Sequence, residues 1–240
     1  FAIIDDHSRL ITHGQFYLAE TLDNYLDCLW SAMRKRGVPR KLYVDNGPSF
    51  RAHRLQLGCA SLEVGLSYAR PYRPQGKGKI ERFFRTVRMQ FLPELNEDMN
   101  LEKINALFTR YLEQTYHQRI HGTTGQKPID RYLADVKALR KAPDNLPEFF
   151  RRQEIRKVNN DRTVQLMGRL YEAPVGLVGM KVILRYEDPD RIEVFLDEKS
   201  MGFLKDLNQE VNSRIKRDSP PQASTTVSGG QLFERATGAR

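Results

Sequence analysis

Apolar runs and helical repeats alternate along the first 142 residues. Strand-like runs occupy 1–4, 10–18, 42–44 and part of 61–69. Helical periodicity occupies 21–36, 55–60, a segment from 79 to about Pro93, 101–117 and 128–139. Ile80, Phe84, Val87 and Phe91 form the expected apolar stripe of the third helix. Two strands first, then strand–helix alternation, predict an α/β domain with a mixed sheet and flanking helices over 1–142.

The pattern changes after residue 142. Two prolines and an acidic pair near 142–147 predict a linker over 143–158. Short strands separated by turns follow at 163–167, 170–173, 181–186, 191–195 and 202–205. Five strands in about sixty residues predict a small SH3-like all-β barrel over 159–210. Residues 211–240 are rich in Pro, Ser, Thr and Gly, which is typical of a flexible tail.

Composition narrows the class of partner. The net charge is +9 and the pI is near 9.6, which favours a polyanion: nucleic acid first, an anionic membrane surface second. No apolar run approaches the length of a transmembrane helix, so none is expected, and no secretion signal is visible. Nucleic acid is the expected partner, and a membrane is not. Cys28 and Cys59 are isolated, which indicates neither a zinc knuckle nor a disulfide framework and fits a reducing cytoplasm.

Asp45 and Glu81 are the candidate catalytic pair. Asp45 ends an apolar run, Glu81 lies in the first turn of a helix, and 35 residues separate them. A carboxylate at the carboxyl end of a strand lies at the open edge of an α/β sheet, and one near a helix N-terminus gains from the helix dipole. Carboxylate oxygens suit Mg²⁺, and phosphoryl transfer commonly uses two such ions about 4 Å apart.

Each carboxylate also has an ordinary explanation. Asp-Asn-Gly at 45–47 is a common turn sequence, and Glu81 suits any first helical turn. The surrounding charges favour the metal site, because a solvated helix normally mixes both signs and Glu81 is the only anion among seven cations from 70 to 88. These cations, which we expect to contact a phosphate backbone, are Arg70, Arg73, Lys77, Lys79, Arg82, Arg85 and Arg88. Arg85 and Arg88 share the helix face of Glu81.

The segments 1–10, 44–50 and 69–85 resemble the catalytic core of retroviral integrases and bacterial DDE transposases. The motif Asp-Asn-Gly-Pro-Ser-Phe from Asp45 and the 35-residue spacing to Glu81, after Tyr-Arg-Pro-Gln and Gly-Lys-Gly-Lys-Ile, are similar to the family's D,D(35)E pattern. Residues 159–205 resemble the barrel of phage Mu-type transposases. Together the likeness covers about nine-tenths of the chain.

The resemblance implies an RNase H-like fold, two Mg²⁺ ions (with Mn²⁺ as a substitute) and attack by a DNA 3′-OH on target DNA. It also implies a homo-oligomer assembled on transposon ends in the bacterial cytoplasm, at the nucleoid when it acts. Tails of related systems dock a helper AAA+ ATPase; for residues 211–240 a plain linker is an equal alternative.

One part of the family pattern is displaced. The first catalytic Asp of the family lies on a strand that would precede Phe1, so the resemblance implies that these 240 residues lack the first strand and do not catalyse alone. Asp5 or Asp6 serving as that ligand is the alternative.

The loop before Glu81 has a second expected role. Tyr72, Gln75 and Lys77 are expected to contact the DNA end, as the family likeness supports, with an ordinary loop as the alternative. Asn46 supports the metal site, contacts DNA or serves only the turn.

Other features have more ordinary interpretations. His117 and His121 have a zinc-like i,i+4 spacing without a third ligand, so zinc is not expected. Trp30 is expected in the core. The predicted barrel is either a DNA-binding or a protein-docking module, and its cations moderately favour DNA.

The sequence therefore predicts a DNA transposase or integrase that cleaves 3′ ends and transfers them into target DNA. Two alternatives stay open. One is an RNase H-like nuclease that hydrolyses without joining. The other is a non-catalytic DNA-binding assembly subunit that keeps the fold.

Overall fold

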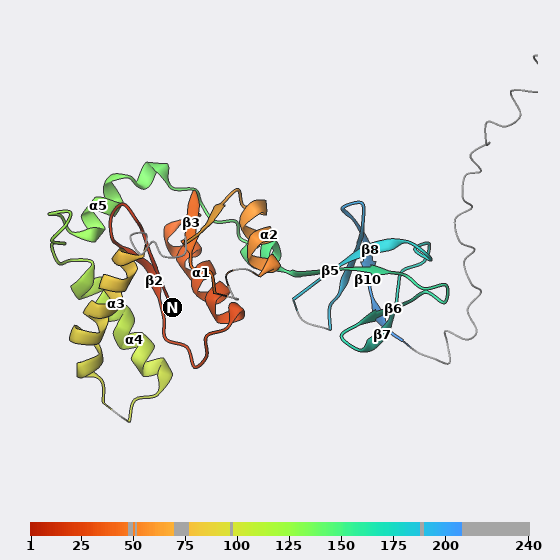
Figure 1. Cartoon of the computed structure of the whole chain (residues 1–240), viewed down its shortest axis with the longest axis horizontal. Helices are drawn as coiled ribbons and strands as arrows, with labels where there is room; N and C mark the ends of the chain where they lie inside the picture. Colours follow the sequence, from red (N-terminus) through yellow and green to blue (C-terminus); the bar gives the residue numbers. More distant parts are fainter. Residues whose placement is uncertain (48–49, 51, 70–76, 97, 188–189, 208–240) are drawn as a thin grey trace, which may run out of the picture. The chain divides into compact units, whose positions relative to one another are not determined.

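The chain folds into two compact units, Phe1–Arg151 and Arg152–Arg240 (Figure 1). The computed structural model describes residues 1–47, 50, 52–69, 77–96, 98–187 and 190–207. The predicted tail, 211–240, lies outside the described residues. None of the described helices is both long and apolar enough to cross a membrane.

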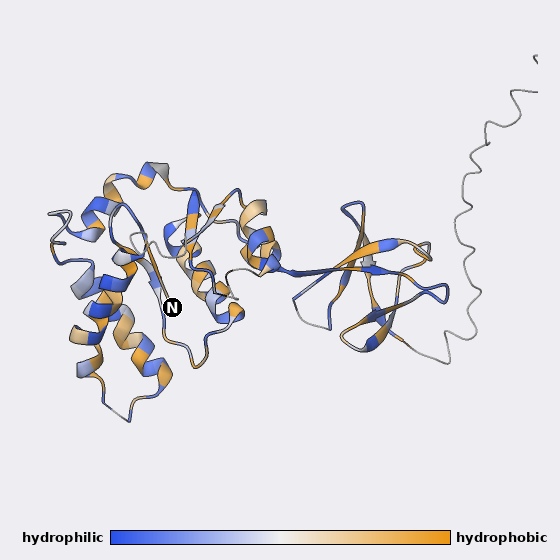
Figure 2. Ribbon diagram, in the orientation of Figure 1, coloured by the Kyte–Doolittle hydropathy of each residue, from blue (hydrophilic) through white to orange (hydrophobic). Residues whose placement is uncertain are grey.

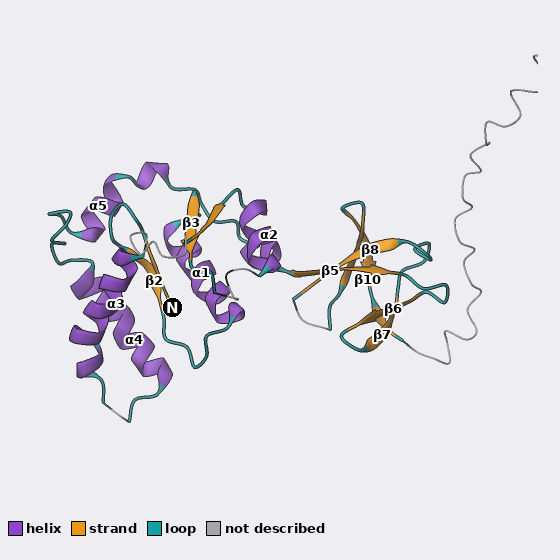
Figure 3. Cartoon of the chain, viewed as in Figure 1, coloured by secondary structure: helices purple, strands orange, loops and turns teal. Residues whose placement is uncertain are grey.

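The first unit contains both helices and strands, which confirms the predicted α/β class (Figure 3). Its strands are β1 (Ala2–Ile4), β2 (Ile11–Gly14), β3 (Lys41–Val44) and β4 (Gly65–Tyr68). Its helices are α1 (Leu22–Arg36), α2 (His53–Ser61), α3 (Gly78–Gln90), α4 (Leu101–Tyr111) and α5 (Pro128–Ala134). Short helical turns lie at Leu92–Glu94, Leu112–Tyr116, Val136–Ala138 and Leu146–Phe150, the second of them a π-helical turn. β1 pairs antiparallel with β2, and β3 pairs parallel with β4 in a separate sheet.

Helix α1 forms where its periodicity predicts. The Thr21 hydroxyl accepts a hydrogen bond from the backbone N–H of Asn24 and caps the helix, and Gly37 ends it at a φ of +88°. Its buried face packs with residues of α2, β3 and β4 into the first core. Figure 2 shows hydrophobic and hydrophilic residues along this helix. Trp30 packs against this core, as predicted.

Helix α3 buries the predicted face except at one position. Phe83 and Val87 are buried together with Phe91 just beyond the helix, whereas Phe84 is 38% exposed. Both phenylalanines are compatible with a stripe through Ile80 and Val87. The Tyr116 ring packs edge-on against Phe83 with ring centroids 5.0 Å apart, which favours burial of Phe83 over Phe84. Phe83, Phe108 and Phe91 then form the second core of the unit.

The segment expected as a linker, 143–158, contains ordered structure. Leu146 and Phe150 are fully buried in the first core. The Phe150 ring packs directly against Gly58. A Cβ atom at residue 58 would lie only 2.2 Å from the nearest ring atom, so this close approach requires glycine. Strand β5 (Arg152–Lys157) follows directly and belongs to the second unit.

The second unit is built of strands, as predicted. After β5 come β6 (Thr163–Leu166), β7 (Arg169–Glu172), β8 (Lys181–Tyr186), β9 (Glu193–Leu196), β10 (Lys199–Phe203) and β11 (Lys205–Asp206). They pair antiparallel in a four-stranded sheet, β10-β9-β8-β5, and a three-stranded sheet, β11-β7-β6. Residues from both sheets share one apolar core. Closure into a barrel stays a prediction.

Candidate active site

Asp45 lies directly after β3, at the carboxyl end of the parallel pair. Its Oδ1 accepts a hydrogen bond from the backbone N–H of Gly47 at 2.9 Å, which fixes the carboxylate in the turn. Its Oδ2 accepts from the Lys77 ammonium at 3.4 Å. The side chain is 42% exposed, so a solvated ligand can reach it. Both the turn interpretation and the edge position therefore hold for the same residue.

Lys77 connects this strand end to the helix that carries Glu81. Lys77 stands at the N-cap position of α3, and its carbonyl accepts a hydrogen bond from the Glu81 backbone N–H at 3.0 Å. Residues four apart in a helical turn share a face, so Glu81 projects from the same side of α3 as the lysine that contacts Asp45. Glu81 is exposed and lies in the first turn, at the positive end of the helix dipole.

A second lysine on the same turn contacts another acidic residue. The Lys79 ammonium lies 2.5 Å from Asp6 Oδ1, in the turn between β1 and β2. Asp5 has a different environment: its Oδ2 accepts from both the backbone N–H and the hydroxyl of Ser8, at 2.7 and 2.6 Å. Asp5 therefore stabilises the β1–β2 turn, a role that the sequence left open.

Asn46 serves the fold at this point. Its side-chain amide donates to the Ala69 carbonyl at 2.6 Å and joins the end of β3 to the end of β4. Four expected DNA contacts, Arg70, Tyr72, Arg73 and Gln75, lie outside the described residues. The structure thus describes Asp45, Asn46 and the helix of Glu81, but not the loop between them.

The exposed side of α3 is basic, as the sequence predicts. Arg82, Arg85 and Arg88 are all exposed. Arg82 donates to the Thr123 hydroxyl at 3.4 Å, and Arg88 is the basic residue of the last turn. Arg85 and Arg88 follow Glu81 by four and seven residues, so a polyanion at Glu81 would meet them next.

The donor chemistry of Asp45 and Glu81 fits a divalent metal. Mg²⁺ prefers carboxylate oxygens and keeps several water ligands, which suits exposed side chains. The Lys77 ammonium beside Oδ2 shows that this oxygen is open to a cation. Among the described residues, no group of three or more His, Cys, Asp or Glu side chains lies together as a metal-binding cluster.

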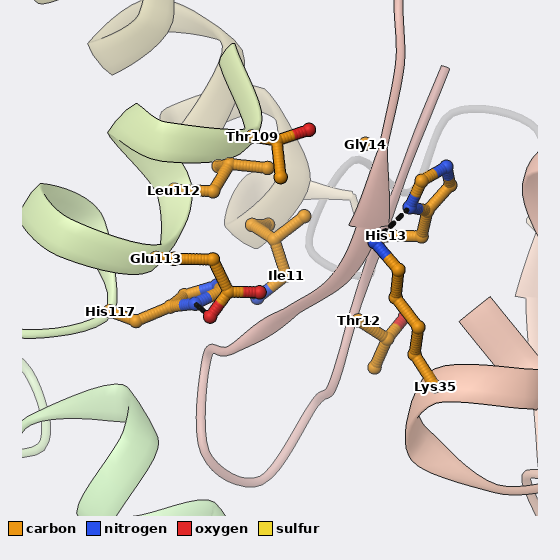
Figure 4. Close-up of a pocket in the computed structure, with 9 residues that line it drawn as sticks. All are labelled: Ile11, Thr12, His13, Gly14, Lys35, Thr109, Leu112, Glu113 and His117. Atoms are coloured by element: carbon orange, nitrogen blue, oxygen red, sulfur yellow. Dashed lines mark hydrogen bonds and ion pairs between the residues drawn. The ribbon is translucent and has the colours of Figure 1, made fainter. Parts of the chain in front are cut away.

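A small pocket lies apart from these residues and was not predicted. It is lined by residues of β2, α1 and α4 with the following π-helical turn, among them His13, Lys35, Glu113 and His117 (Figure 4). His117 is fully buried, and its Nε2 accepts a hydrogen bond from the Ile11 backbone N–H at 3.2 Å. Burial lowers the pKa of His117. The histidine therefore joins the π-helical turn to the edge of β2, which is a structural role.

Cations also gather on the second unit. Lys157 on β5 and Lys181 on β8 are direct cross-strand partners, and both are exposed. Like charges directly opposite in an antiparallel pair destabilise it. The Arg185 guanidinium lies over the Phe195 ring, 4.3 Å from its centroid. Glu193 lies directly opposite Arg185 in the β8–β9 pair, so this face of the sheet carries both signs of charge.

Comparison with known proteins supports the assignment that the motifs suggested. Residues 2–97, which include Asp45 and Glu81, match the TnsB C-terminal domain family. The chain is similar to bacterial transposases. It is 27% identical over 222 residues to the transposase of transposon Tn552 from Staphylococcus aureus, covering 80% of this chain and 45% of that protein.

Two viral proteins match smaller shares of the chain than the Tn552 transposase does. The Pol-related polyprotein of the mouse intracisternal A-particle MIA14 is 37% identical over 90 residues, covering 33% of this chain and 10% of the polyprotein. Among solved structures, the catalytic core domain of BIV integrase matches with a TM-score of 0.47 and 24% identity, covering 57% of this chain and 86% of that one. The chain spans about half the length of the bacterial transposases it matches.

Proposed function

We propose that the chain is the catalytic core and C-terminal β unit of a DDE transposase that cleaves the 3′ ends of its transposon and joins them to target DNA. The observation that supports this proposal is the contact of Lys77 with Asp45, because Lys77 stands at the N-cap of α3 and Glu81 lies in the first turn of that helix. The match of residues 2–97 to a transposase family supports it.

Asp45 and Glu81 would hold the divalent ions, Mg²⁺ with Mn²⁺ as a substitute. When bound, such ions activate the attacking oxygen and stabilise the leaving 3′ oxygen. The protein residues orient the DNA: Arg85 and Arg88 hold the phosphate backbone beside Glu81, and Lys79 with Asp6 fixes the start of α3. The displacement is in line and forms no covalent bond to the protein.

A third acidic ligand completes the proposed site. Asp5 Oδ2 is held by Ser8, whereas Asp6, like Asp45, contacts a partly exposed lysine and stays a candidate for this ligand. Assembly as a homo-oligomer on paired transposon ends, and docking of a helper AAA+ ATPase on residues 211–240, belong to the same proposal. The resemblance in the motifs supports them.

The test is a strand-transfer assay on the complete natural protein that contains these residues. It uses labelled transposon ends, a target plasmid, Mg²⁺ and Glu81→Gln, which removes the charge and little volume. We expect joined product with the wild type and none with the variant, while the affinity for the ends stays within about twofold because the amide keeps the shape of the helix turn.

A charge-matched control is Glu102→Gln on α4, which also removes one exposed carboxylate from a first helical turn. This variant should join ends like the wild type. End cleavage without joining by the wild type would identify the nuclease instead. Binding without either reaction would identify an assembly subunit, and joining by Glu81→Gln would refute the site.

A further inference from the structure

The Asp45 carboxylate has one oxygen in use within the turn and one facing outward. Oδ1 accepts the Gly47 backbone N–H, so Oδ2 is the oxygen that remains for a cation. Lys77 lies at that oxygen, with Nζ 3.4 Å from Oδ2. Both side chains are about one-third to two-fifths exposed, so the pair is solvated and can separate at little cost.

A divalent metal on Asp45 would need the same oxygen. The ammonium donates to the lone pairs that a metal would use, and its positive charge would repel a dication a few ångströms away. Lys77 therefore has to leave Oδ2 when a metal binds there. Its side chain is long and flexible, and Lys77 heads the basic helix face of Arg85 and Arg88, so a nearby DNA phosphate is the anion that it can reach next.

We propose that Lys77 is a positioning residue that exchanges Asp45 for DNA phosphate, and so couples metal binding to DNA binding. This inference rests on the proposed function for the metal and the DNA. In the free chain Lys77 neutralises Asp45 and is withheld from DNA. A metal on Asp45 releases the ammonium to the phosphate backbone. Because linkage is reciprocal, DNA raises the metal affinity by the same factor by which metal raises the DNA affinity.

Lys79 provides a matched comparison within the same helical turn. It carries the same charge and is similarly exposed, but its partner is Asp6 rather than Asp45. A metal on Asp45 does not displace Lys79. Loss of Lys79 should therefore weaken DNA binding equally with and without metal, whereas loss of Lys77 should remove the dependence of DNA binding on metal.

The first measurement is Mn²⁺ binding to the purified chain without DNA, followed by the electron paramagnetic resonance signal of free Mn²⁺. Lys77→Ala should bind Mn²⁺ about two- to fivefold more tightly than the wild type. A change of this size corresponds to the free energy of a typical exposed ion pair. Lys79→Ala should match the wild type. Asp45→Asn should bind more weakly, because it removes the ligand charge.

The second measurement is the affinity for a short DNA duplex with and without Mn²⁺, at one fixed ionic strength. The dissociation constant without Mn²⁺ divided by that with Mn²⁺ should exceed one for the wild type and for Lys79→Ala. For Lys77→Ala this ratio should fall toward one. Circular dichroism confirms that each variant is folded.

The outcomes separate this inference from the proposed function. If Asp45→Asn weakens Mn²⁺ binding but Lys77→Ala changes neither the Mn²⁺ affinity nor the DNA ratio, the exchange is refuted and the metal site stands. If Asp45→Asn binds Mn²⁺ like the wild type, the metal site fails, and the role of Lys77 fails with it.

Discussion

Asn46 shows how a residue beside a catalytic candidate can serve the fold. Its sequence position allowed a metal-supporting, DNA-contacting or turn role. In the structure its amide donates to the Ala69 carbonyl, and Ala69 is buried. A buried carbonyl that loses its donor is costly, so the structure gives Asn46 a role in joining β3 to β4 that can be tested.

Asn46→Ala should lower the free energy of unfolding by about 1–3 kcal/mol, because it leaves the Ala69 carbonyl without this donor. Urea denaturation measures the change. Asn24→Ala is the control, because it removes the same kind of bond, to Ala19, at an exposed position. An unchanged stability together with a lower DNA affinity would show that Asn46 contacts DNA instead.

His117 makes the stability of the first unit depend on pH. Its pKa in the folded chain lies below the ordinary 6.5, chiefly because burial disfavours the imidazolium; Glu113 partly opposes this shift and Arg36 adds to it. As pH falls below about 6.5, the unfolded chain therefore binds a proton at this histidine before the folded chain does. The free energy of unfolding then decreases from its value at higher pH. Protonation also removes the Nε2 acceptor of Ile11.

We expect the wild type to lose more unfolding free energy than His117→Gln between pH 8 and pH 5.5. The glutamine carbonyl can still accept from Ile11 but does not titrate. His13 and His121, whose pKa values burial also lowers, remain in both proteins and cancel in the comparison. Urea titrations at several pH values provide the measurement, and parallel losses in the two proteins would contradict the assignment.

At the scale of elements, hydrophobic periodicity in the sequence predicted where the helices lie. Helix α1 has a capping threonine, a single apolar stripe and a terminating glycine, and it forms where these signals place it. Helix α3 was placed correctly, and so was its apolar stripe, except that Phe83 is buried in place of Phe84. Phe83 and Phe84 both satisfy the helical spacing, and the tertiary contacts of Phe83 with Phe108 and Tyr116 favour its burial.

Strand β5 was missed because its own sequence is polar. Arg-Gln-Glu-Ile-Arg-Lys at 152–157 has one apolar residue, and that residue, Ile155, is 66% exposed. Its place in the sheet comes from six cross-strand residue pairs with β8, and no local sequence pattern predicts them. The turn Leu146–Phe150 was missed for a similar reason, because Phe150 is buried by a close approach to Gly58 far away in the chain.

The Lys157–Lys181 pair between β5 and β8 should destabilise the sheet, and this effect can be tested. Lys181→Glu should raise the free energy of unfolding by about 0.2–1 kcal/mol, because an attractive pair with Lys157 replaces a repulsive one. The same change should weaken DNA binding if this face contacts the phosphate backbone. Lys181→Gln should be intermediate in both respects. Urea denaturation and a duplex-binding titration decide, and unchanged DNA affinity would favour a protein-docking role for the second unit.

At the scale of the whole molecule, composition predicted the partner class and the motif predicted the site, but neither predicted the connections within it. The 35-residue spacing singled out Asp45 and Glu81 as candidates. The contacts of Lys77 with Asp45 and of Lys79 with Asp6 join residues 32 and 73 positions apart, and a single sequence offers no signal for such pairings.

The net charge of +9 leads to a prediction about salt. If the basic face of α3 holds a phosphate backbone, each arginine lost from it removes about one released counterion. Arg85→Ala and Arg88→Ala should each reduce the slope of log affinity against log salt by about 0.9 for duplex DNA. Arg110→Ala, which removes an exposed arginine from the end of α4, should leave the slope unchanged.

This comparison separates a located contact from a general effect of charge. A diffuse attraction between a basic chain and DNA would respond alike to the loss of any one of the three arginines, since each changes the net charge by the same amount. A backbone held against α3 would respond only to Arg85 and Arg88, because counterions are released where phosphates are contacted. Equal slopes for all three variants would therefore contradict the placement of DNA beside Glu81, even if the overall affinity remained high.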